Sequence, residues 1–367
     1  MKLTGDQVLT ETSTNVVDSK GNLKLYHYTT CDDIAPESLK QVRGVILDSS
    51  NNNIVVRSFP YTNEFIGVET NLPFLNERRK NMYFHSNEGT IIRVFHYAGE
   101  WHVSTHRRID AFQSRWGGPC SFGEFFQAAI ETCLEKPFAE FLETLDKSHQ
   151  YIFLLYSTPQ TRIVSPSLPY PFVSLVATII DGEFRFDNRI EGIHMQKQIE
   201  FDSTRTDIEN ITEYINACNS DKSKQGIFIV STDTTSGDQY FYKIVSPVYH
   251  ELSLLRGNAY DIPTRFLELR IQKSDKVNDF IQLFSEYTGL FMFMESRIDN
   301  LITHIFAKYR ARFTHRQYAP VHPVLYPFMK SIMQQVNSSP EITRDVVCQC
   351  FARQPISYIT KMLSVHF

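Results

Sequence analysis

The pattern of apolar and polar positions changes once along the chain. Up to about residue 255, runs of strand-forming residues stand on either side of short turn sequences, a pattern typical of β-hairpins. Three hairpins are predicted, at residues 42–59, 90–105 and 173–186. Two stretches with helical character interrupt them, at 122–145 and 207–219. This first part therefore predicts a mainly antiparallel sheet structure with a few helices.

After Thr264 the apolar period becomes helical. Val277, Phe280, Ile281 and Phe284 follow the i, i+3, i+4, i+7 spacing of one helix face, and Ser274-Asp275 can cap that helix. Further helices are expected around 290–313, 324–336, 341–352 and 356–365, with Pro323, Pro340 and Pro355 near the starts of the last three. The predicted class is α+β, with an antiparallel-sheet domain at 1–260 followed by a small all-α C-terminal domain at 265–367.

Composition agrees with a folded protein of two domains. The chain has 367 residues, 42% hydrophobic and 21% charged, which excludes a disordered or coiled-coil chain. Lys and Arg total 37 against 41 Asp and Glu, a net charge of −4. That balance excludes a wholly basic nucleic-acid coat and leaves room for a local basic groove. The aromatic content of 13% favours a sheet-rich core.

Targeting and metal signals are weak. The N-terminus is polar from Lys2 onward, so no signal peptide is expected, and no apolar run approaches the roughly 20 residues of a membrane helix. The six cysteines form no CxxC pair, which favours reduced thiols in the cytoplasm. The histidines after residue 300 and the pair Cys348 and Cys350 lack metal-ligand spacing, so no metal site is expected.

Six short sequence motifs follow one another between residues 43 and 249. They are Arg43–Asp48 with Val55–Pro60, Ser86–Thr90, Ser104–Arg108, Leu154–Tyr156 with Thr161–Val164, Gln225–Ile229, and Lys243–Tyr249. Over residues 40–257 these segments resemble the nucleotidyltransferase domain of the bacteriophage-type RNA ligases, the RNA ligase 1-like family. The resemblance implies an ATP-grasp-like ligase fold. It also implies an origin in a large DNA virus, where degenerate members of this kind are expected.

Four positions depart from the family pattern. The lysine that bonds AMP aligns with Ser86, and the glutamate of the following motif aligns with Leu155. The metal-orienting glutamate aligns with Gln225, and the second lysine of the KxK motif aligns with Val245. Every departure removes a charge from one pocket. A serine attacks only with help from a nearby base, so the resemblance implies that this chain does not form lysyl-AMP.

The retained residues suit binding. Glu88 and Gly89 keep the acidic-glycine pair of the nucleophile motif, where the resemblance implies close approach of the backbone to a ligand. A cationic lining for a nucleotide or RNA is expected from Arg43, Arg57, Arg93, Arg107, Arg108 and Lys243. Trp101 and Trp116 can stack on bases, although packing in a hairpin core is their more ordinary role.

Three functions remain open. The first is an RNA ligase-like pseudoenzyme that binds RNA or a nucleotide, or is a scaffold with other proteins in a larger viral assembly, in the cytoplasm or the virion. The second is an active ATP-dependent RNA ligase, using Mg²⁺ and a displaced nucleophile, Lys80 or Lys243. The third is a purely structural interaction protein.

One positive cluster lies outside these motifs. Lys308, Arg310, Arg312, His315 and Arg316 stand together at the end of a predicted helix. Two roles are open for it: to complement the helix dipole, or to contact RNA.

Overall fold

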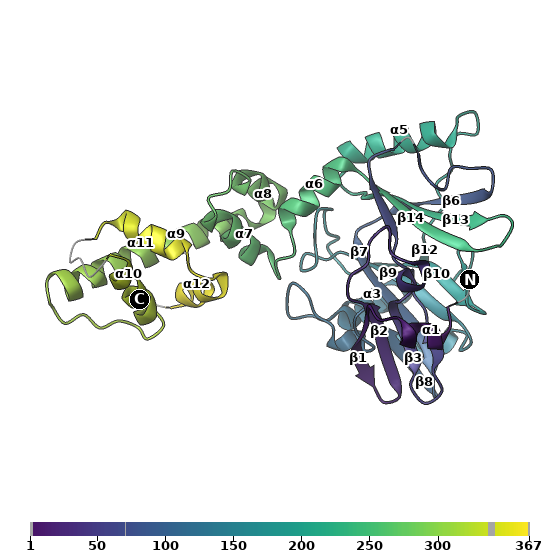
Figure 1. Ribbon diagram of the computed structural model, residues 1–367, viewed down its shortest axis with the longest axis horizontal. Coiled ribbons are helices and arrows are strands. Elements are labelled where there is room, and N and C mark those ends of the chain that lie inside the picture. Colours follow the sequence, from purple (N-terminus) through teal and green to yellow (C-terminus); the bar gives the residue numbers. More distant parts are fainter. Residues whose placement is uncertain (1–2, 70, 337–341, 366–367) are drawn as a thin grey trace. The chain divides into compact units, whose positions relative to one another are not determined.

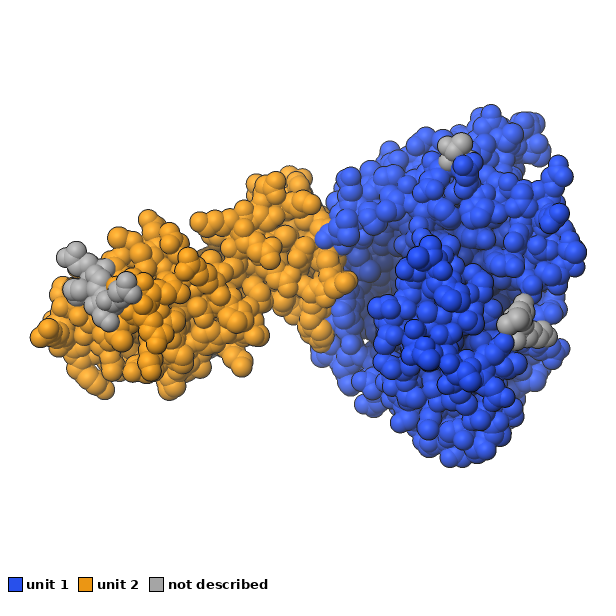
Figure 2. Space-filling view, in the orientation of Figure 1, with its two compact units in different colours: residues 1–254 blue, residues 255–367 orange. Residues whose placement is uncertain are grey.

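The computed structural model describes residues 3–69, 71–336 and 342–365. The chain forms two compact units, residues 1–254 and 255–367 (Figure 2). The first combines three sheets with a few helices and the second is helical, so the protein is of the α+β class (Figure 1). The division falls inside helix α6 (Pro247–Arg256), a few residues before the boundary expected at 260–265.

The first sheet of unit 1 is an antiparallel meander in the order β1-β2-β3-β4. Its strands are β1 (Thr14–Lys20), β2 (Leu23–Tyr28), β3 (Arg43–Asp48) and β4 (Asn53–Val56). The hairpin predicted at 42–59 is confirmed as β3 and β4, with Asn52 in the turn at a φ of 59°. The sequence interpretation did not include β1 and β2.

The other two sheets contain the remaining predicted hairpins. The second has the order β11-β10-β9-β7-β8, with β12 beside β10, and the third has the order β5-β14-β13-β6. Both predicted hairpins, β7–β8 and β10–β11, are confirmed in the second sheet. Its strands are β7 (Gly89–Tyr97), β8 (Glu100–Ser104), β9 (Gln150–Tyr156), β10 (Val173–Ile180), β11 (Glu183–Arg185) and β12 (His194–Met195). The third sheet consists of β5 (Asn63–Ile66), β6 (Arg79–Ser86), β13 (Gly226–Asp233) and β14 (Gln239–Val245).

An aromatic core joins the second and third sheets. Ile152 and Leu154 of β9 pack with Phe84, Val230 and Phe241 of the third sheet. The rings of Phe59, Phe184, Phe228 and Phe241 lie 5.1–6.0 Å apart in this cluster. The high aromatic content of the sequence is therefore mainly core material between sheets.

Helices cover the outer faces of these sheets. Helix α3 (Phe122–Leu134) packs on the second sheet through Phe126 and Ile130. The helical stretch predicted at 122–145 is confirmed, and it consists of two helices: Glu135 has a φ of 52° and Pro137 follows, so a second helix, α4, begins at Phe138 and ends at Thr144. Proline has no amide hydrogen to continue the first helix, which explains the break. Two short helices, α1 (Gly5–Thr10) and α2 (Glu37–Lys40), complete this part.

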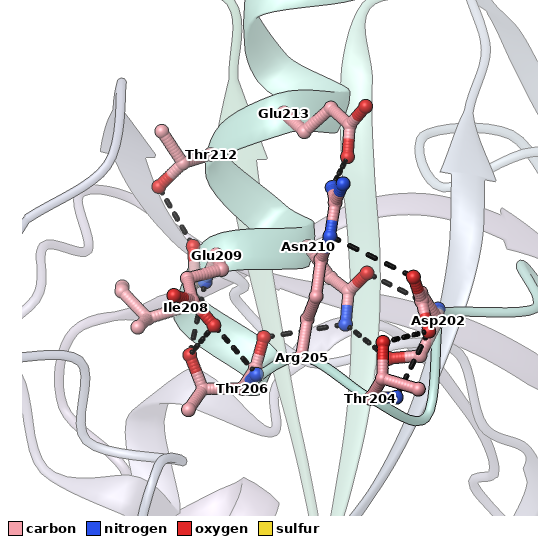
Figure 3. Close-up of polar contacts among 9 residues, drawn as sticks. All are labelled: Asp202, Thr204, Arg205, Thr206, Ile208, Glu209, Asn210, Thr212 and Glu213. Carbon is pink, nitrogen blue, oxygen red and sulfur yellow. Dashed lines mark hydrogen bonds and ion pairs between the residues drawn. The ribbon is translucent and has the colours of Figure 1, made fainter.

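Helix α5 (Asp207–Ser220) covers the third sheet and confirms the helix predicted at 207–219. Figure 3 shows how its start is fixed: Thr206 and Glu209 form a reciprocal capping box, and Asn210 reaches back to the backbone of Asp202. The Tyr83 hydroxyl of β6 also donates a hydrogen bond to Asp207 at 2.5 Å. The capping box satisfies backbone amides that a helix start otherwise leaves unpaired, and the other two bonds attach the helix start to its surroundings.

Unit 2 is a set of helices. The expected helices at 274–284, 290–313, 324–336, 341–352 and 356–365 correspond to α8 (Val277–Leu283), α9 (Thr288–Tyr309), α10 (Tyr326–Gln335), α11 (Arg344–Ala352) and α12 (Ile356–Leu363). Pro340, expected near the start of α11, lies outside the described residues. Lys276, not Ser274 or Asp275, is the N-cap of α8. The helices α6 and α7 (Ile262–Ile271) were not expected from the sequence.

The core of unit 2 lies around α9. Leu301 and Ile305 of α9 pack against Phe328 of α10, Val347 of α11 and Met362 of α12, and all five are fully buried. None of the helices in the described part of the chain is long and apolar enough to cross a membrane.

Candidate functional site

Residues of three motif segments lie together at one end of the core between the second and third sheets. Lys243 of β14 lies on the same face of the third sheet as Phe241, and its Nζ is 3.2 Å from Oε1 of Glu64 on β5. Arg43 of β3 and Glu88 are close enough to act electrostatically on Lys243. We call Arg43, Glu64, Ser86, Glu88 and Lys243 the motif site.

Burial controls the charge of Lys243. Burial lowers the pKa of its ammonium group, the neighbouring Glu64 carboxylate raises it, and Arg43 lowers it further. Only 16% of the Lys243 side chain is exposed, whereas 54% of the Glu64 side chain is exposed, so water reaches the ion pair from the Glu64 side. A partly buried, ion-paired lysine can meet a phosphate only by exchanging or sharing its carboxylate partner.

Ser86 and Gln225 form a closed neutral pair. The Ser86 hydroxyl donates a hydrogen bond to Oε1 of Gln225 at 3.1 Å, and the backbone N–H of Gln225 donates to the Ser86 backbone carbonyl at 2.9 Å. Ser86 is only 6% exposed. The resemblance assigns these positions to the nucleophilic lysine and to the metal-orienting glutamate. In this protein they bond to each other, and neither carries a charge.

Glu88 has four donors inside the protein. Its carboxylate accepts hydrogen bonds from the backbone amides of Ile163, Val164 and Ser165 at 2.6–2.8 Å, and from the Tyr249 hydroxyl at 2.8 Å. Burial, followed by the Glu88 carboxylate, raises the pKa of Tyr249 strongly, so this phenol remains a donor. Glu88 therefore holds the loop after β9 against the start of α6.

Gly89 serves strand packing. A Cβ atom at this position would lie 2.4 Å from the carbonyl oxygen of Leu155 and 2.8 Å from Cδ1 of Leu154. The close backbone approach that was expected toward a ligand is thus made toward strand β9.

The two apolar departures lie in different surroundings. Leu155 is 2% exposed and packs with Phe126 of α3, on the face of β9 opposite to Leu154. Val245 is 3% exposed and pairs with Gly226 in the third sheet. Leu155 therefore points away from the aromatic core between the sheets, while Val245 lies next to the motif site.

Arg93 is a buried structural cation. Its guanidinium donates hydrogen bonds to the carbonyls of Gly44 and of Thr105, the latter at 2.5 Å. It is 1% exposed, and burial lowers its pKa to about 9. These bonds tie β3 of the first sheet to the end of β8, so the side chain is not available at the surface.

The remaining arginines of the predicted cationic lining lie in different places. Arg107 is exposed and acts electrostatically on His27 and His106, as Arg43 does. Arg108 lies apart, 3.4 Å from Asp18 on β1. Arg57 donates to the Leu3 carbonyl at 2.6 Å and lines a cavity of about 590 Å³, together with Ser58, Tyr61 and Tyr240.

Two histidines, the buried His27 and the half-buried His106, were not predicted at this site. His27 and His106 lie among Arg43, Arg93 and Arg107, and burial together with these cations lowers the pKa of both rings, that of His27 to about 4. Nε2 of His106 is 2.5 Å from the Ser58 hydroxyl. The only sequence signal for His27 is the alternation Leu23, Leu25, His27, which places all three on the buried face of β2.

Lys80 lies far from the motif site. It is exposed near the opposite end of β6 from Ser86, six residues away. At about 3.3 Å per residue the two Cα atoms are roughly 20 Å apart. A displaced nucleophile at Lys80 would therefore act far from the motif site. Trp101 packs in the core under α3, in its ordinary role. Among the described residues, no group of three or more His, Cys, Asp or Glu side chains is arranged to hold a metal ion.

Comparison with known proteins adds viral relatives. The chain is similar to the "Immediate-early protein ICP-46 homolog" of Invertebrate iridescent virus 6, with 31% identity over 288 residues, covering 70% of this chain and 59% of that relative. The protein of the same description from Invertebrate iridescent virus 3 is 28% identical over 291 residues, covering 77% and 63%. The chain thus spans about three fifths of the length of these relatives. Both relatives are viral, which supports the viral part of the sequence expectation. No family model matches.

Solved structures similar to the chain include two described as archaeal ATP-dependent RNA ligase, form 1 and form 2. Their TM-scores are 0.44 and 0.42, and each is 13% identical to this chain. The matches cover 80% and 78% of this chain, and 76% and 71% of the ligase chains.

Proposed function

We propose that unit 1 is an RNA ligase-like nucleotidyltransferase domain that binds the phosphates of a nucleotide or of RNA without forming lysyl-AMP. The observation that carries the proposal is the neutral Ser86–Gln225 pair at the positions of the nucleophile and of the metal-orienting acid. A hydroxyl that donates to an amide oxygen has no base to remove its proton. The motif order and the convergence of Arg43, Glu88 and Lys243 support the ligase-like assignment.

Binding, in this proposal, uses the cations that remain accessible. Arg43 and Arg107 act on the same two histidines, His27 and His106, and Arg107 is exposed. Both histidines stay neutral at pH 7 because their pKa values are lowered, so an anion is attracted mainly by the arginines. Lys243 contributes when a phosphate replaces or shares Glu64 as its partner.

A second candidate function rests on Lys243 alone. Burial lowers the pKa of this lysine, as a nucleophilic amine requires. An active ligase with ATP and Mg²⁺ as cofactors would then use Lys243 in place of the residue at position 86.

Adenylation separates the two candidates. The full chain is incubated with α-³²P-labelled ATP and Mg²⁺, denatured, and examined for label on the protein. We expect no adduct. An adduct that disappears in Lys243→Gln and persists in Lys80→Gln, a matched exposed lysine of the same unit, would establish the ligase and refute our proposal.

Nucleotide binding is measured next, by titration of a fluorescent ATP analogue at low salt. We expect binding that is weakened at least about tenfold in the Arg43→Gln/Arg107→Gln variant and unchanged in Lys80→Gln. If the wild-type chain binds neither the analogue nor a 5′-phosphorylated oligonucleotide at unit 1, the structural interaction role replaces binding. The next experiment would then be a search for protein partners in a viral assembly.

A further inference from the structure

The basic charge of unit 2 is confined to one acid-free stretch. Unit 2 contains 14 Lys and Arg against 9 Asp and Glu, a net charge of +5. No acidic residue occurs between Asp299 and Glu341, where five of those basic residues lie: Lys308, Arg310, Arg312, Arg316 and Lys330. The rest of the unit is balanced, nine against nine. The whole excess therefore comes from this stretch.

The middle of the stretch is an ordered turn. Helix α9 passes at Arg310 into a π-helical turn that ends at Thr314. Tyr309 is fully buried and Phe313 packs against the same core, with their rings 4.8 Å apart. Backbone hydrogen bonds of 2.9 Å, from His315 to the Arg310 carbonyl and from Gln317 to the Ala311 carbonyl, close the turn. We call Arg310–Tyr318 the basic turn.

The cations of the basic turn point to solvent. Arg310, Arg312, His315 and Arg316 are all exposed. Within the described residues none of these four side chains forms an ion pair with a carboxylate, whereas Arg344 pairs with Asp299 nearby in the same unit. Exposed arginines without carboxylate partners can bind phosphates without first breaking an ion pair.

Aromatic rings accompany these cations. The Tyr318 side chain is 91% exposed and Tyr326 is 46% exposed. The Arg312 guanidinium lies over the Tyr326 ring, 5.7 Å from its centroid. Exposed aromatic rings interleaved with arginines are the combination that binds single strands, because bases stack on the rings while the cations meet the backbone.

We propose that the basic turn of unit 2, with Tyr326, binds a single-stranded nucleic acid. Arg310, Arg312 and Arg316 neutralise successive phosphates, and Tyr318 stacks on an unpaired base. An anionic membrane fits less well, because Phe313, the large apolar residue of the turn, packs against the core. This surface goes beyond the proposed function of unit 1 and does not depend on it.

The test measures binding of the full chain to a 5′-fluorescein-labelled 20-nucleotide oligouridylate by fluorescence anisotropy, from 20 to 300 mM KCl. The variant Arg310→Gln/Arg312→Gln/Arg316→Gln removes three of the proposed phosphate contacts. We expect the slope of the logarithm of the association constant against the logarithm of the KCl concentration to fall in magnitude by about 2, because each phosphate contact on a single strand contributes about 0.7 to this slope. At 0.1 M salt this corresponds to about a 100-fold loss of affinity.

A matched variant controls for net charge. Lys273→Gln/Lys276→Gln/Lys361→Gln removes three exposed charges of unit 2 outside the acid-free stretch. We expect the affinity of this variant for the oligouridylate to change by less than about threefold. Tyr318→Ala should weaken binding about tenfold with an unchanged slope, because stacking involves no counterion release. The helical circular dichroism signal of each variant confirms that it is folded.

Three results would overturn the proposal. The first is no binding of the oligouridylate by the wild-type chain at 20 mM KCl. The second is an equal loss of oligouridylate affinity in the variant of the basic turn and in the lysine control. The third is binding to phosphatidylserine vesicles without binding to the oligouridylate. Failure of the unit 1 proposal looks different, since it abolishes binding of the ATP analogue and leaves the turn-dependent salt slope intact.

Discussion

The two units use their charged residues in opposite ways. Unit 1 has 23 Lys and Arg against 32 Asp and Glu, a net charge of −9, while unit 2 has a net charge of +5. In unit 1, Arg93 is buried and donates hydrogen bonds to two backbone carbonyls, and Lys243 forms an ion pair with Glu64. In unit 2, Arg310 and Arg316 are exposed. Two of the cations that motif similarity identifies thus form contacts within the fold, whereas the exposed arginines of the basic turn lie outside every motif segment.

The largest effect is expected at Glu88. Replacing Glu88 by Ala leaves three buried backbone amides and the Tyr249 hydroxyl without their acceptor, and should lower the free energy of unfolding of unit 1 by about 4 kcal/mol. Trp101 and Trp116, the only tryptophans of the chain, both lie in unit 1, so urea unfolding followed by tryptophan fluorescence reports on this unit.

Glu100→Ala is the control for this prediction. Glu100 is exposed in β8, and its removal should change the unfolding free energy by less than about 0.5 kcal/mol. If Glu88→Ala were equally mild while nucleotide binding was lost, Glu88 would be a ligand-binding residue and not a structural anchor.

The buried His27 of unit 1 predicts a loss of stability in acid. The pKa of His27 is lowered to about 4 in the folded chain, so the unfolded chain binds more protons between about pH 4 and 6.5. The stability from neutral His27 is present above pH 6.5 and is lost as the pH falls toward 4. Between pH 6.5 and 4.5 we expect His27 to account for a decrease of about 2 kcal/mol.

The measurement compares tryptophan-monitored urea unfolding at the two pH values for the wild type and for His27→Gln. The variant should lose about 2 kcal/mol less than the wild type over this range. His194→Gln replaces an exposed histidine of the same unit and should behave as the wild type. Equal pH dependence in all three proteins would show that the pKa of His27 is the same in the folded and the unfolded chain, and would refute its lowering by burial.

A smaller effect is expected at the neutral pair of the motif site. Ser86→Ala leaves Oε1 of Gln225 without the hydroxyl donor and should cost about 1 kcal/mol in the same assay. Lysyl-AMP formation should be absent both before and after the change. Loss of a previously present adduct in Ser86→Ala would mean that the pair is catalytic and would remove the contrast with unit 2.

The predictable part of the fold and the site follows from local signals. The hairpins at 42–59, 90–105 and 173–186 were predictable because turn residues and alternating apolar residues act over a few positions. The motif order placed Arg43, Glu88 and Lys243 in one site. Sequence could not reveal that Glu88 accepts bonds from residues 163–165, or that Gly89 faces β9, because both depend on contacts between distant segments.

Helices α6 and α7 were missed for a related reason. Lys243–Tyr249 was interpreted as one motif, but Pro247 begins a helix, where proline is well suited to the first turn. The basic turn shows the reverse case. Its charges are plain in the sequence, yet only the structure shows that Tyr309 and Phe313 are held by the core while the arginines are exposed.

The smallest expected effect tests the difference between the units most directly. Arg108→Gln in unit 1 breaks an exposed ion pair with Asp18, 3.4 Å long, and should cost at most about 0.5 kcal/mol in tryptophan-monitored unfolding. Arg316→Gln in unit 2 breaks no ion pair and should leave unfolding, followed by circular dichroism, unchanged. Oligouridylate affinity should respond in the opposite order, falling severalfold for Arg316→Gln and little for Arg108→Gln. If Arg316→Gln instead destabilised unit 2 and left affinity unaltered, its charge would serve the fold, and the contrast between the two units would disappear.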